Sequence, residues 1–454
     1  MMQHLAEDRK EKRAKTNCEK KKEEDLIHQL PDGIPVAILS KLPIDEAVRT
    51  SILSSKWRYF WTSFSGTLEF DGSPTMKDMR KDIQKRAISS RGLQMAMDII
   101  YNSERIRYIN WINELLNSLK SPNIEGFKIW FDVGTDGSND VDNWVQFAIQ
   151  KEVQKLELFC GSSYVMPLHL FKLAKFNSLR VFRVRSITVT EEMLEYLLCC
   201  CPNLEVISLN SSLVPASMKI SGKSLQLKRL DLISCLNLET IEISAANLMS
   251  IAYHGLCLDM TFESAPNLME ASFGGGYAEF CGESFLSQLR VLKLNITENA
   301  PQVIYELHQL PELTNLKHLE LTAYVDDGIS LNICVLLLKA SPSLCKLTLK
   351  MLNAEPIFRT VGKFTMENQY KLKELELIGF CGAACEVEFL VYILENAVEL
   401  DKITIDPKLE IDPEWVEGAA HSLVQHETWD HGRNRMRARG LRNKIPPWVE
   451  FVCL

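Results

Sequence analysis

The segment LKHLEL, residues 316–321, holds the pattern that decides the fold of this chain. Apolar residues stand at its first, fourth and sixth positions, and a polar residue separates the last two. The same L-x-x-L-x-L pattern, with aliphatic or aromatic substitutes, recurs along the chain. Its copies begin at Ile124, Val153, Leu179, Leu204, Leu227, Leu248, Leu268, Leu289, Leu316, Leu344, Leu372 and Leu400. The alternation within each copy predicts a short strand with its apolar side chains on one face.

Neighbouring copies start about 20 to 29 residues apart, which is the period of leucine-rich repeats. One such strand cannot bury its apolar face alone, so successive repeats must stack into a solenoid. We therefore predict an α/β fold with leucine-rich repeats over residues 124–364.

The segments between the copies predict what covers the back of the strands. Apolar residues at helical spacing precede the copies at Leu204, Leu344 and Leu400. Two of these stretches reach Pro202 and Pro342, where a helix should end. Between Leu227 and Leu289 the copies stand closer together, and Leu238-Ile241-Ile243 falls midway, so we expect a second strand there instead of a helix.

Length, composition and charge narrow the protein class. A chain of 454 residues, 46% of them hydrophobic, is too long for one compact core and too apolar for general disorder. Its net charge of -8 argues against nucleic acid as the main partner. No apolar run has the length that a membrane-spanning helix needs. Residues 1–24 are strongly charged without an apolar core, which predicts a disordered tail and not a secretory signal, so we expect a nuclear or cytoplasmic protein.

The N-terminal segment from residue 25 to residue 65 differs sharply from that tail. Its apolar residues recur at helical spacing, as in Ile34, Ile38 and Leu42 or in Trp57 and Trp61, and Pro43 separates two of the stretches. Three short helices cannot bury so much apolar surface among themselves. The excess surface should meet another polypeptide.

The order of residues in this segment resembles a plant F-box. The resemblance rests on Leu30-Pro31-Asp32, Ile38-Leu39, Leu42-Pro43, Ala47-Val48-Arg49-Thr50-Ser51, Lys56-Trp57-Arg58 and Trp61. Pro35 and Ser55 depart from the usual pattern, in which an aliphatic and a basic residue are common. In the family the F-box docks on the Skp adaptor of an SCF (Skp–cullin–F-box) ubiquitin ligase. The residues that we expect at this adaptor-binding surface are Leu30, Pro31, Ile34, Ile38, Leu39, Leu42, Val48, Leu53, Trp57 and Trp61.

The C-terminal part carries a second resemblance. Residues 372–407 and the ending from Arg433 to Leu454 are similar to the FBD region that follows leucine-rich repeats in many plant F-box proteins. We accordingly expect an F-box over residues 25–65, a helical linker over 66–123, the repeats, and the FBD region with a terminal cap over 365–454.

A basic cluster near the C-terminus is the strongest local charge anomaly. It consists of Arg433, Arg435, Arg437, Arg439, Arg442 and Lys444. The favoured interpretation is a solvated terminal helix that covers the last repeat through Trp448, Val449 and Phe451. The alternative is a grip on an acidic partner or an anion.

The resemblance implies a non-catalytic adaptor that brings a target protein to a ubiquitin ligase, with a cullin bound through the Skp adaptor. The target and its contact residues are unknown. Two alternatives stay open: a repeat protein that holds a small molecule, and a repeat protein that regulates a GTPase. A small-molecule site would need basic residues on the inner strand face, whereas Glu157, Glu320 and Glu376 stand there.

No catalytic residue, cofactor or metal site is expected. His421, His426 and His431 are spaced so that they do not share one helix face. The loop with Asp132, Asp136 and Gly137 lacks further calcium ligands. Gly274, Gly275 and Gly276 lack the lysine of a phosphate-binding loop. Thirteen irregularly spaced cysteines without a C-x-x-C pair give no disulfide or zinc pattern, and we interpret Cys381 and Cys385 as small buried residues.

Overall fold

The computed structural model describes most of the chain. The described residues are 31–53, 57–72, 91–134, 137–161, 164–173, 176–222, 225–256, 258–275, 284–296, 311–324, 329–352, 369–408 and 431–454. The chain divides into two compact units, Met1–Leu156 and Glu157–Leu454. The expected disordered tail and Leu30 lie outside the described residues.

The first unit begins with short helices and continues with parallel strands. Its elements are α2 (Gly33–Leu39), α3 (Ile44–Arg49), the 3₁₀ turn η2 (Thr50–Ile52), α4 (Trp57–Phe60), η3 (Trp61–Ser63), β1 (Thr67–Asp71), α6 (Arg91–Ser118), β2 (Gly126–Trp130) and α7 (Ser138–Gln150). β1 pairs in parallel with β2, so that Leu68 stands beside Phe127. The segment expected to be a helical linker therefore holds a strand as well as the helix α6. Leu68 and Phe70 alternate with polar residues, which is the spacing of a strand.

The second unit is built on parallel strands that follow one another in chain order. They are β3 (Lys155–Phe159, which begins in the first unit), β4 (Val181–Arg185), β5 (Val206–Asn210), β7 (Arg229–Ile233), β9 (Ser250–Gly255), β11 (Glu270–Gly275), β12 (Val291–Ile296), β13 (His318–Tyr324), β14 (Lys346–Leu352), β15 (Glu374–Ile378), β16 (Lys402–Asp406) and β17 (Glu450–Cys453). In register, Leu319 stands between Leu292 and Leu347. Each predicted L-x-x-L-x-L copy forms a strand, which confirms the repeat fold.

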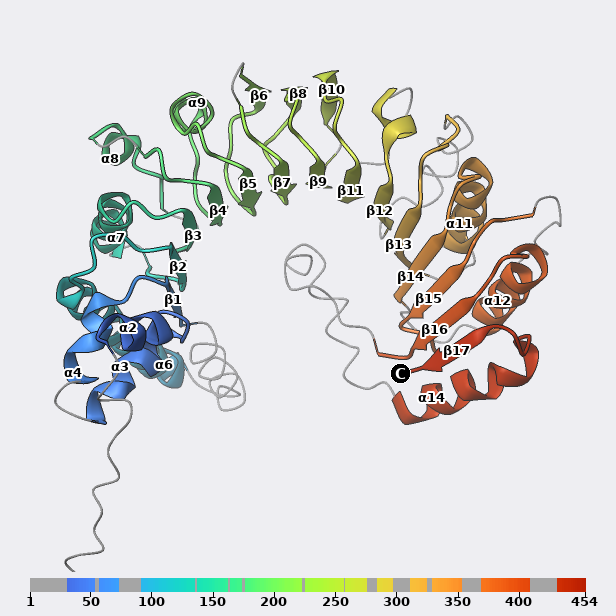
Figure 1. Cartoon of the computed structure of the whole chain (residues 1–454), viewed down its shortest axis with the longest axis horizontal. Coiled ribbons are helices and arrows are strands. Elements are labelled where there is room, and N and C mark those ends of the chain that lie inside the picture. The colour runs from blue at the N-terminus through green and yellow to red at the C-terminus, as the bar shows by residue number, and fades with distance from the viewer. Residues whose placement is uncertain are drawn as a thin grey trace, which may run out of the picture. The chain divides into compact units, whose positions relative to one another are not determined.

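Helices and a small second sheet lie on one side of this large sheet (Figure 1). They are α8 (Leu168–Leu173), α9 (Glu191–Cys200), η5 (Ser284–Gln288), α11 (Ile329–Ala340), α12 (Ala384–Asn396), and the strands β6 (Ser217–Ser221), β8 (Thr240–Ser244) and β10 (Asp259–Ser264), ordered β10-β8-β6. α9 and α11 end just before Pro202 and Pro342, as predicted. The predicted second strand is β8, and two neighbours that were not predicted, β6 and β10, extend it into a sheet.

The apolar positions of the repeat form the core. Leu227, Leu230 and Leu232, the defining residues of one copy, are fully buried. Burial of such a side chain contributes about 1.5 to 3 kcal/mol. The repeats therefore stabilise one another through stacked apolar layers.

Side-chain amides connect successive turns before the strands. Asn203 donates to the carbonyl oxygen of Asn177 at 2.9 Å, and Asn267 donates to that of Ala246 at 2.8 Å. The same contact to the preceding repeat is made by Asn247, Gln288 and Asn315. These amides satisfy backbone groups that a turn would otherwise leave without a partner.

The C-terminal end is closed by α14 (His431–Gly440), the 3₁₀ turn η8 (Leu441–Lys444) and β17. Val449 is buried and Phe451 is half-buried, as predicted for the residues that cover the last repeat. Trp448 was also predicted to pack there and is instead 76% exposed. Trp448 lies in the turn that the Val449 N–H closes on the carbonyl oxygen of Pro446 at 3.1 Å, and its side chain is directed away from the last repeat.

Among the described helices, none combines the length and the apolar character required to cross a bilayer.

Candidate protein-binding surfaces

An apolar surface covers the short N-terminal helices. Ile34 and Ile38 lie one turn apart on α2 and are 47% and 49% exposed. Leu53, which follows η2, is 66% exposed. Pro31 is exposed, whereas Leu42, Val48 and Trp61 are half-buried. Most of the described residues predicted to bind the adaptor therefore have side chains that a partner can reach.

Two of the predicted residues have a different position. Leu39 is buried on the side of α2 that also buries Pro35, and Trp57 is buried with its ring nearly perpendicular to that of Phe60, at a centroid distance of 5.7 Å. These two side chains hold the helices together beneath the surface. Their contribution to a partner contact is indirect.

Sequence reasoning missed two members of this surface. Ile52 is 86% exposed and Tyr59 is 63% exposed. The α3 helix gives way to a 3₁₀ turn at Thr50, and this tighter turn sets the direction of the Ile52 side chain. We call Ile34, Ile38, Ile52, Leu53 and Tyr59 the apolar surface.

Hydrogen bonds hold these helices against the start of the sheet within the first unit. The backbone N–H of Ser65 donates to Ser40 Oγ at 3.0 Å, and that of Lys120 donates to the carbonyl oxygen of Thr62 at 2.7 Å. Below them, Phe64 and Leu68 are fully buried. The apolar surface therefore lies on a fixed base.

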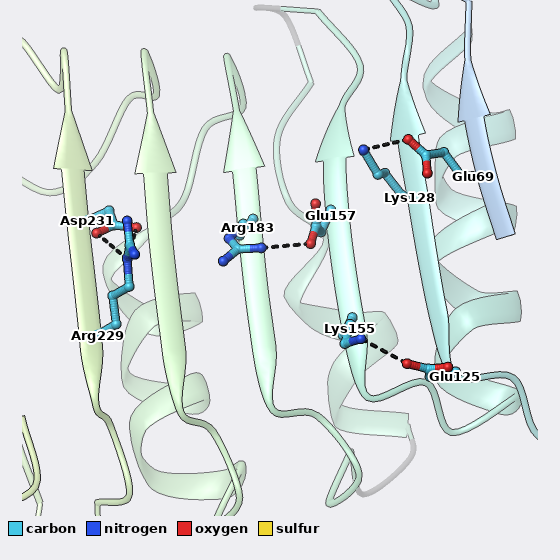
Figure 2. Close-up of polar contacts among 8 residues, drawn as sticks. All are labelled: Glu69, Glu125, Lys128, Lys155, Glu157, Arg183, Arg229 and Asp231. Atoms are coloured by element: carbon cyan, nitrogen blue, oxygen red, sulfur yellow. Dashed lines mark hydrogen bonds and ion pairs between the residues drawn. The ribbon is translucent and has the colours of Figure 1, made fainter. Parts of the chain in front are cut away.

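The second surface is the face of the large sheet that carries the first, third and fifth side chains of each strand, which we call the open face. In the second unit, charged side chains on this face pair with each other (Figure 2). Arg183 on β4 contacts Glu157 on β3 at 2.9 Å, and Arg229 contacts Asp231 on its own strand at 2.9 Å. Farther along are the pairs Lys293–Glu270, Lys350–Glu320, Lys346–Glu376 and Lys402–Glu450.

The first unit shows the same pairing on its own strands. Lys128 on β2 contacts Glu69 on β1 at 2.6 Å, and Lys155 contacts Glu125 at 2.8 Å (Figure 2). The side-chain hydrogen bond and the charge of Lys155 lower the pKa of Glu125, although burial opposes that shift. Pairing between neighbouring repeats is thus a regular feature of the strands.

The pairing corrects the expectation of a mostly aliphatic or acidic inner face. Glu157, Glu320 and Glu376 each face a cation, from Arg183, Lys350 and Lys346 respectively. Sequence reasoning considered one strand at a time, whereas each partner comes from a neighbouring repeat. The open face of the described strands is therefore balanced in charge.

Three ionisable side chains are buried within the open face, namely Arg185, Asp231 and His254. Burial raises the pKa of Asp231, although Arg229, Arg183 and a hydrogen bond from Ser208 oppose the shift. Burial lowers the pKa of His254 to about 3, and its Nε2 lies 2.9 Å from Ser272 Oγ. His254 is therefore neutral at physiological pH and belongs to the sheet interior.

The cysteine pair near α12 has a structural position. Cys381 and Cys385 are buried, as predicted, and burial raises their thiol pKa values to about 12 and about 11. Beside them, the Glu386 carboxylate accepts hydrogen bonds from the backbone N–H groups of Cys381, Gly382 and Ala383 at 3.1, 2.7 and 3.0 Å. Glu386 therefore caps α12 from within the core.

The other candidates from the sequence are also accounted for where they are described. Asp132 accepts a hydrogen bond from the Gly134 N–H at 2.9 Å, which forms a local turn, and Asp136 lies outside the described residues. His421, His426 and Gly276 lie outside them too. Within the described part of the chain, no three metal-ligating side chains come together.

Comparison with known proteins agrees with this architecture. The family model described as At1g61320/AtMIF1, LRR domain, matches residues 168–427, which is more than half of the chain. The chain is similar to the Arabidopsis thaliana F-box/FBD/LRR-repeat protein At1g13570, with 25% identity over 433 residues, covering 85% of this chain and 92% of the relative. It is 24% identical to the F-box/FBD/LRR-repeat protein At5g53840 of the same plant, over 84% of this chain and 88% of the relative.

Some relatives match only in part. The putative F-box/LRR-repeat protein At5g02700 of Arabidopsis thaliana is 26% identical over 212 residues, and the match spans 41% of this chain and 39% of the relative. The two longer matches, by contrast, cover more than four fifths of this chain and of each relative. This chain is a member of the plant F-box/FBD/leucine-rich-repeat protein family.

Proposed function

We propose that this protein is the substrate-recognition subunit of an SCF-type ubiquitin ligase. The apolar surface docks on a Skp adaptor, and through it on a cullin, while the open face of the repeats binds the target protein. The protein itself is a non-catalytic adaptor, because ubiquitin transfer is performed by other subunits.

The observation that carries the proposal is the apolar surface. Ile52 and Leu53 are 86% and 66% exposed next to each other, and α2 adds Ile34 and Ile38. Large apolar anchors that become desolvated on binding dominate the free energy of protein association. Helical anchors of this kind suit a partner with an apolar groove.

The open face supports the second half of the proposal. A charge-balanced surface of paired side chains gives specificity for a complementary protein more than it gives raw affinity. Most of the cations that a small anionic ligand would need contact carboxylates on the described strands, as Lys346 contacts Glu376. Neither of the alternative functions gains support from this arrangement.

A binding measurement with a purified plant Skp homologue tests the proposal. Changing Ile52→Glu and Leu53→Glu places two charges in the proposed contact, and we expect the affinity to fall by about a hundredfold or more. The matched control changes Leu213→Glu and Leu236→Glu, which are 57% and 66% exposed in the second unit. This control should bind like the unaltered chain. Equal affinity of the first variant and the unaltered chain would contradict the proposal.

A further inference from the structure

The segment formed by α14 and η8 is strongly basic. Residues 431–444 hold six arginine or lysine residues and no acidic residue, in a chain whose net charge is -8. Neither the apolar surface nor the open face uses these cations. Their arrangement shows which of them serve the fold and which are available.

One side of the segment is committed to the fold. Asn434, Ala438 and Leu441 are buried and recur every three or four residues, so they form one side of the helix. Arg437 donates to the carbonyl oxygen of Cys381 at 2.9 Å, and Arg442 donates to that of Val449 at 3.1 Å. These contacts hold the segment against the last repeats.

Another side of the segment presents cations that pair with no other described residue. Arg435 and Arg439 lie four residues apart on α14, so their side chains are neighbours on one flank of the helix. Both are exposed, as is Lys444 on η8. Among the described residues these three side chains make no hydrogen bond or ion pair, in contrast to the paired cations of the open face.

Two exposed apolar side chains belong to the same C-terminal region as these cations. Met436 on α14 is 75% exposed, and Trp448 is 76% exposed in the residue next to Val449, whose carbonyl oxygen binds Arg442. Exposed tryptophan and arginine are typical anchors of protein interfaces. The surface therefore combines positive charge with large apolar groups.

We propose that Arg435, Arg439, Lys444, Met436 and Trp448 form a docking site for an acidic segment of a partner protein that also carries apolar residues. Arginine forks bind carboxylates in bidentate pairs. Met436 and Trp448 give the apolar residues of that segment their contacts. The site does not depend on adaptor binding by the N-terminal helices.

The chemistry favours a peptide over other polyanions. A net charge of -8 on the whole chain opposes the approach of an extended nucleic acid, whereas a short acidic segment meets only the local field. A membrane would require an exposed apolar side along the helix, but Ala438 of α14 and Leu441 of η8 are buried against the fold.

Fluorescence anisotropy with the full chain tests the site. The probe is a labelled peptide rich in Asp, Glu, Leu and Trp. Changing Arg435→Glu and Arg439→Glu should raise its dissociation constant at least about tenfold, and high salt should weaken binding to the unaltered chain. The neutral variant Arg435→Gln with Arg439→Gln should lie between the two. Circular dichroism establishes that the variants fold.

The matched control carries the same change in net charge at another place. Arg107→Glu with Lys219→Glu alters two cations whose side chains are 79% and 60% exposed. It should bind the peptide like the unaltered chain. Equal weakening by both double variants, or no weakening by either, would overturn the proposal.

Two further arms identify the occupant. A single-stranded oligonucleotide or anionic phospholipid vesicles that bind more tightly than the peptide, and lose binding in Arg435→Glu with Arg439→Glu, would overturn the assignment to a peptide. The sequence of this chain from residue 409 to residue 430 is itself acidic. A variant of the full chain in which the acidic residues of segment 409–430 are changed to amides provides the last comparison. If the peptide binds this variant but not the unaltered chain, the segment itself occupies the site, which would overturn the assignment to a partner protein.

Discussion

The two main surfaces of this protein differ in the kind of side chain that they expose. The apolar surface exposes Ile34, Ile38, Ile52, Leu53 and Tyr59 on short helices. The open face exposes charged side chains, most of which, like Arg183 and Glu157, already have a partner within the sheet. Exposure of an apolar cluster to water is unfavourable in free energy, so such a cluster is typical of a surface that binds the same partner in every relative. A network of paired charges costs little when it is exposed and can differ among relatives that bind different targets.

The largest expected effect comes from comparing a residue of the repeat core with a residue of the apolar surface. Leu230→Ala should lower the free energy of unfolding by about 3 kcal/mol, because Leu230 is fully buried between stacked repeats. Ile38→Ala should change it by less than about 0.5 kcal/mol and weaken Skp binding instead. Urea denaturation and a Skp binding assay on both variants measure the two effects. A large stability loss in Ile38→Ala would show that the apolar surface serves the fold.

Removal of the buried Glu386 carboxylate should have the next largest effect on the free energy of unfolding. Glu386→Ala leaves three backbone N–H groups at the start of α12 without their acceptor, and we expect a loss of about 2 to 3 kcal/mol. The control Glu388→Ala removes an exposed carboxylate from the same helix and should be nearly neutral. Thermal unfolding distinguishes them. Equal melting temperatures would show that Glu386 does not cap the helix.

The buried histidine of the open face should make stability depend on pH. Burial lowers the folded-state pKa of His254 to about 3, below its unfolded value. Its contribution is therefore complete above the unfolded pKa and is lost as the pH falls toward the folded pKa. Between pH 7 and pH 5 this amounts to about 2 kcal/mol.

Changing His254→Asn should remove that part of the pH dependence. The control His169→Asn alters an exposed histidine on α8 and should retain it. Urea denaturation at both pH values provides the comparison. An unaltered slope in His254→Asn would mean that His254 is protonated in the folded protein.

Only a small effect on stability is expected for the exposed ion pairs. Glu157→Gln should cost less than about 1 kcal/mol, because its partner Arg183 is substantially exposed and the pair is screened by solvent. The same change should alter the affinity for the target protein if that protein is recognised through the charged side chains of the open face. A loss of several kcal/mol in chemical denaturation would contradict the view of these pairs as a recognition surface.

The repeat strands could be predicted from the sequence because apolar and polar residues alternate within every copy. Leu319 and Leu321 must alternate with polar residues in order to be buried, and the same rule located β8 from Ile241 and Ile243. Strand β1 was missed because its partner β2 lies beyond a long helix in the sequence. The charge pairs were missed for the same reason, since Glu157 and Arg183 meet only when repeats stack.

The apolar surface could be predicted only in part. Ile34 and Ile38 follow from helical spacing, and their exposure agrees with it. The exposure of Ile52 depends on a 3₁₀ turn after α3, and the burial of Leu39 and Trp57 depends on how the short helices pack. Periodicity tells which residues share a face, but not whether that face meets the interior or a partner.

Hydrogen exchange of the full chain with and without a plant Skp homologue tests the central claim most directly. We predict that the adaptor protects backbone amides between Gly33 and Ser63 and leaves those of β7 through β15 unchanged. Absence of added protection in the N-terminal helices, or protection confined to the repeats, would contradict the division of labour between the two surfaces.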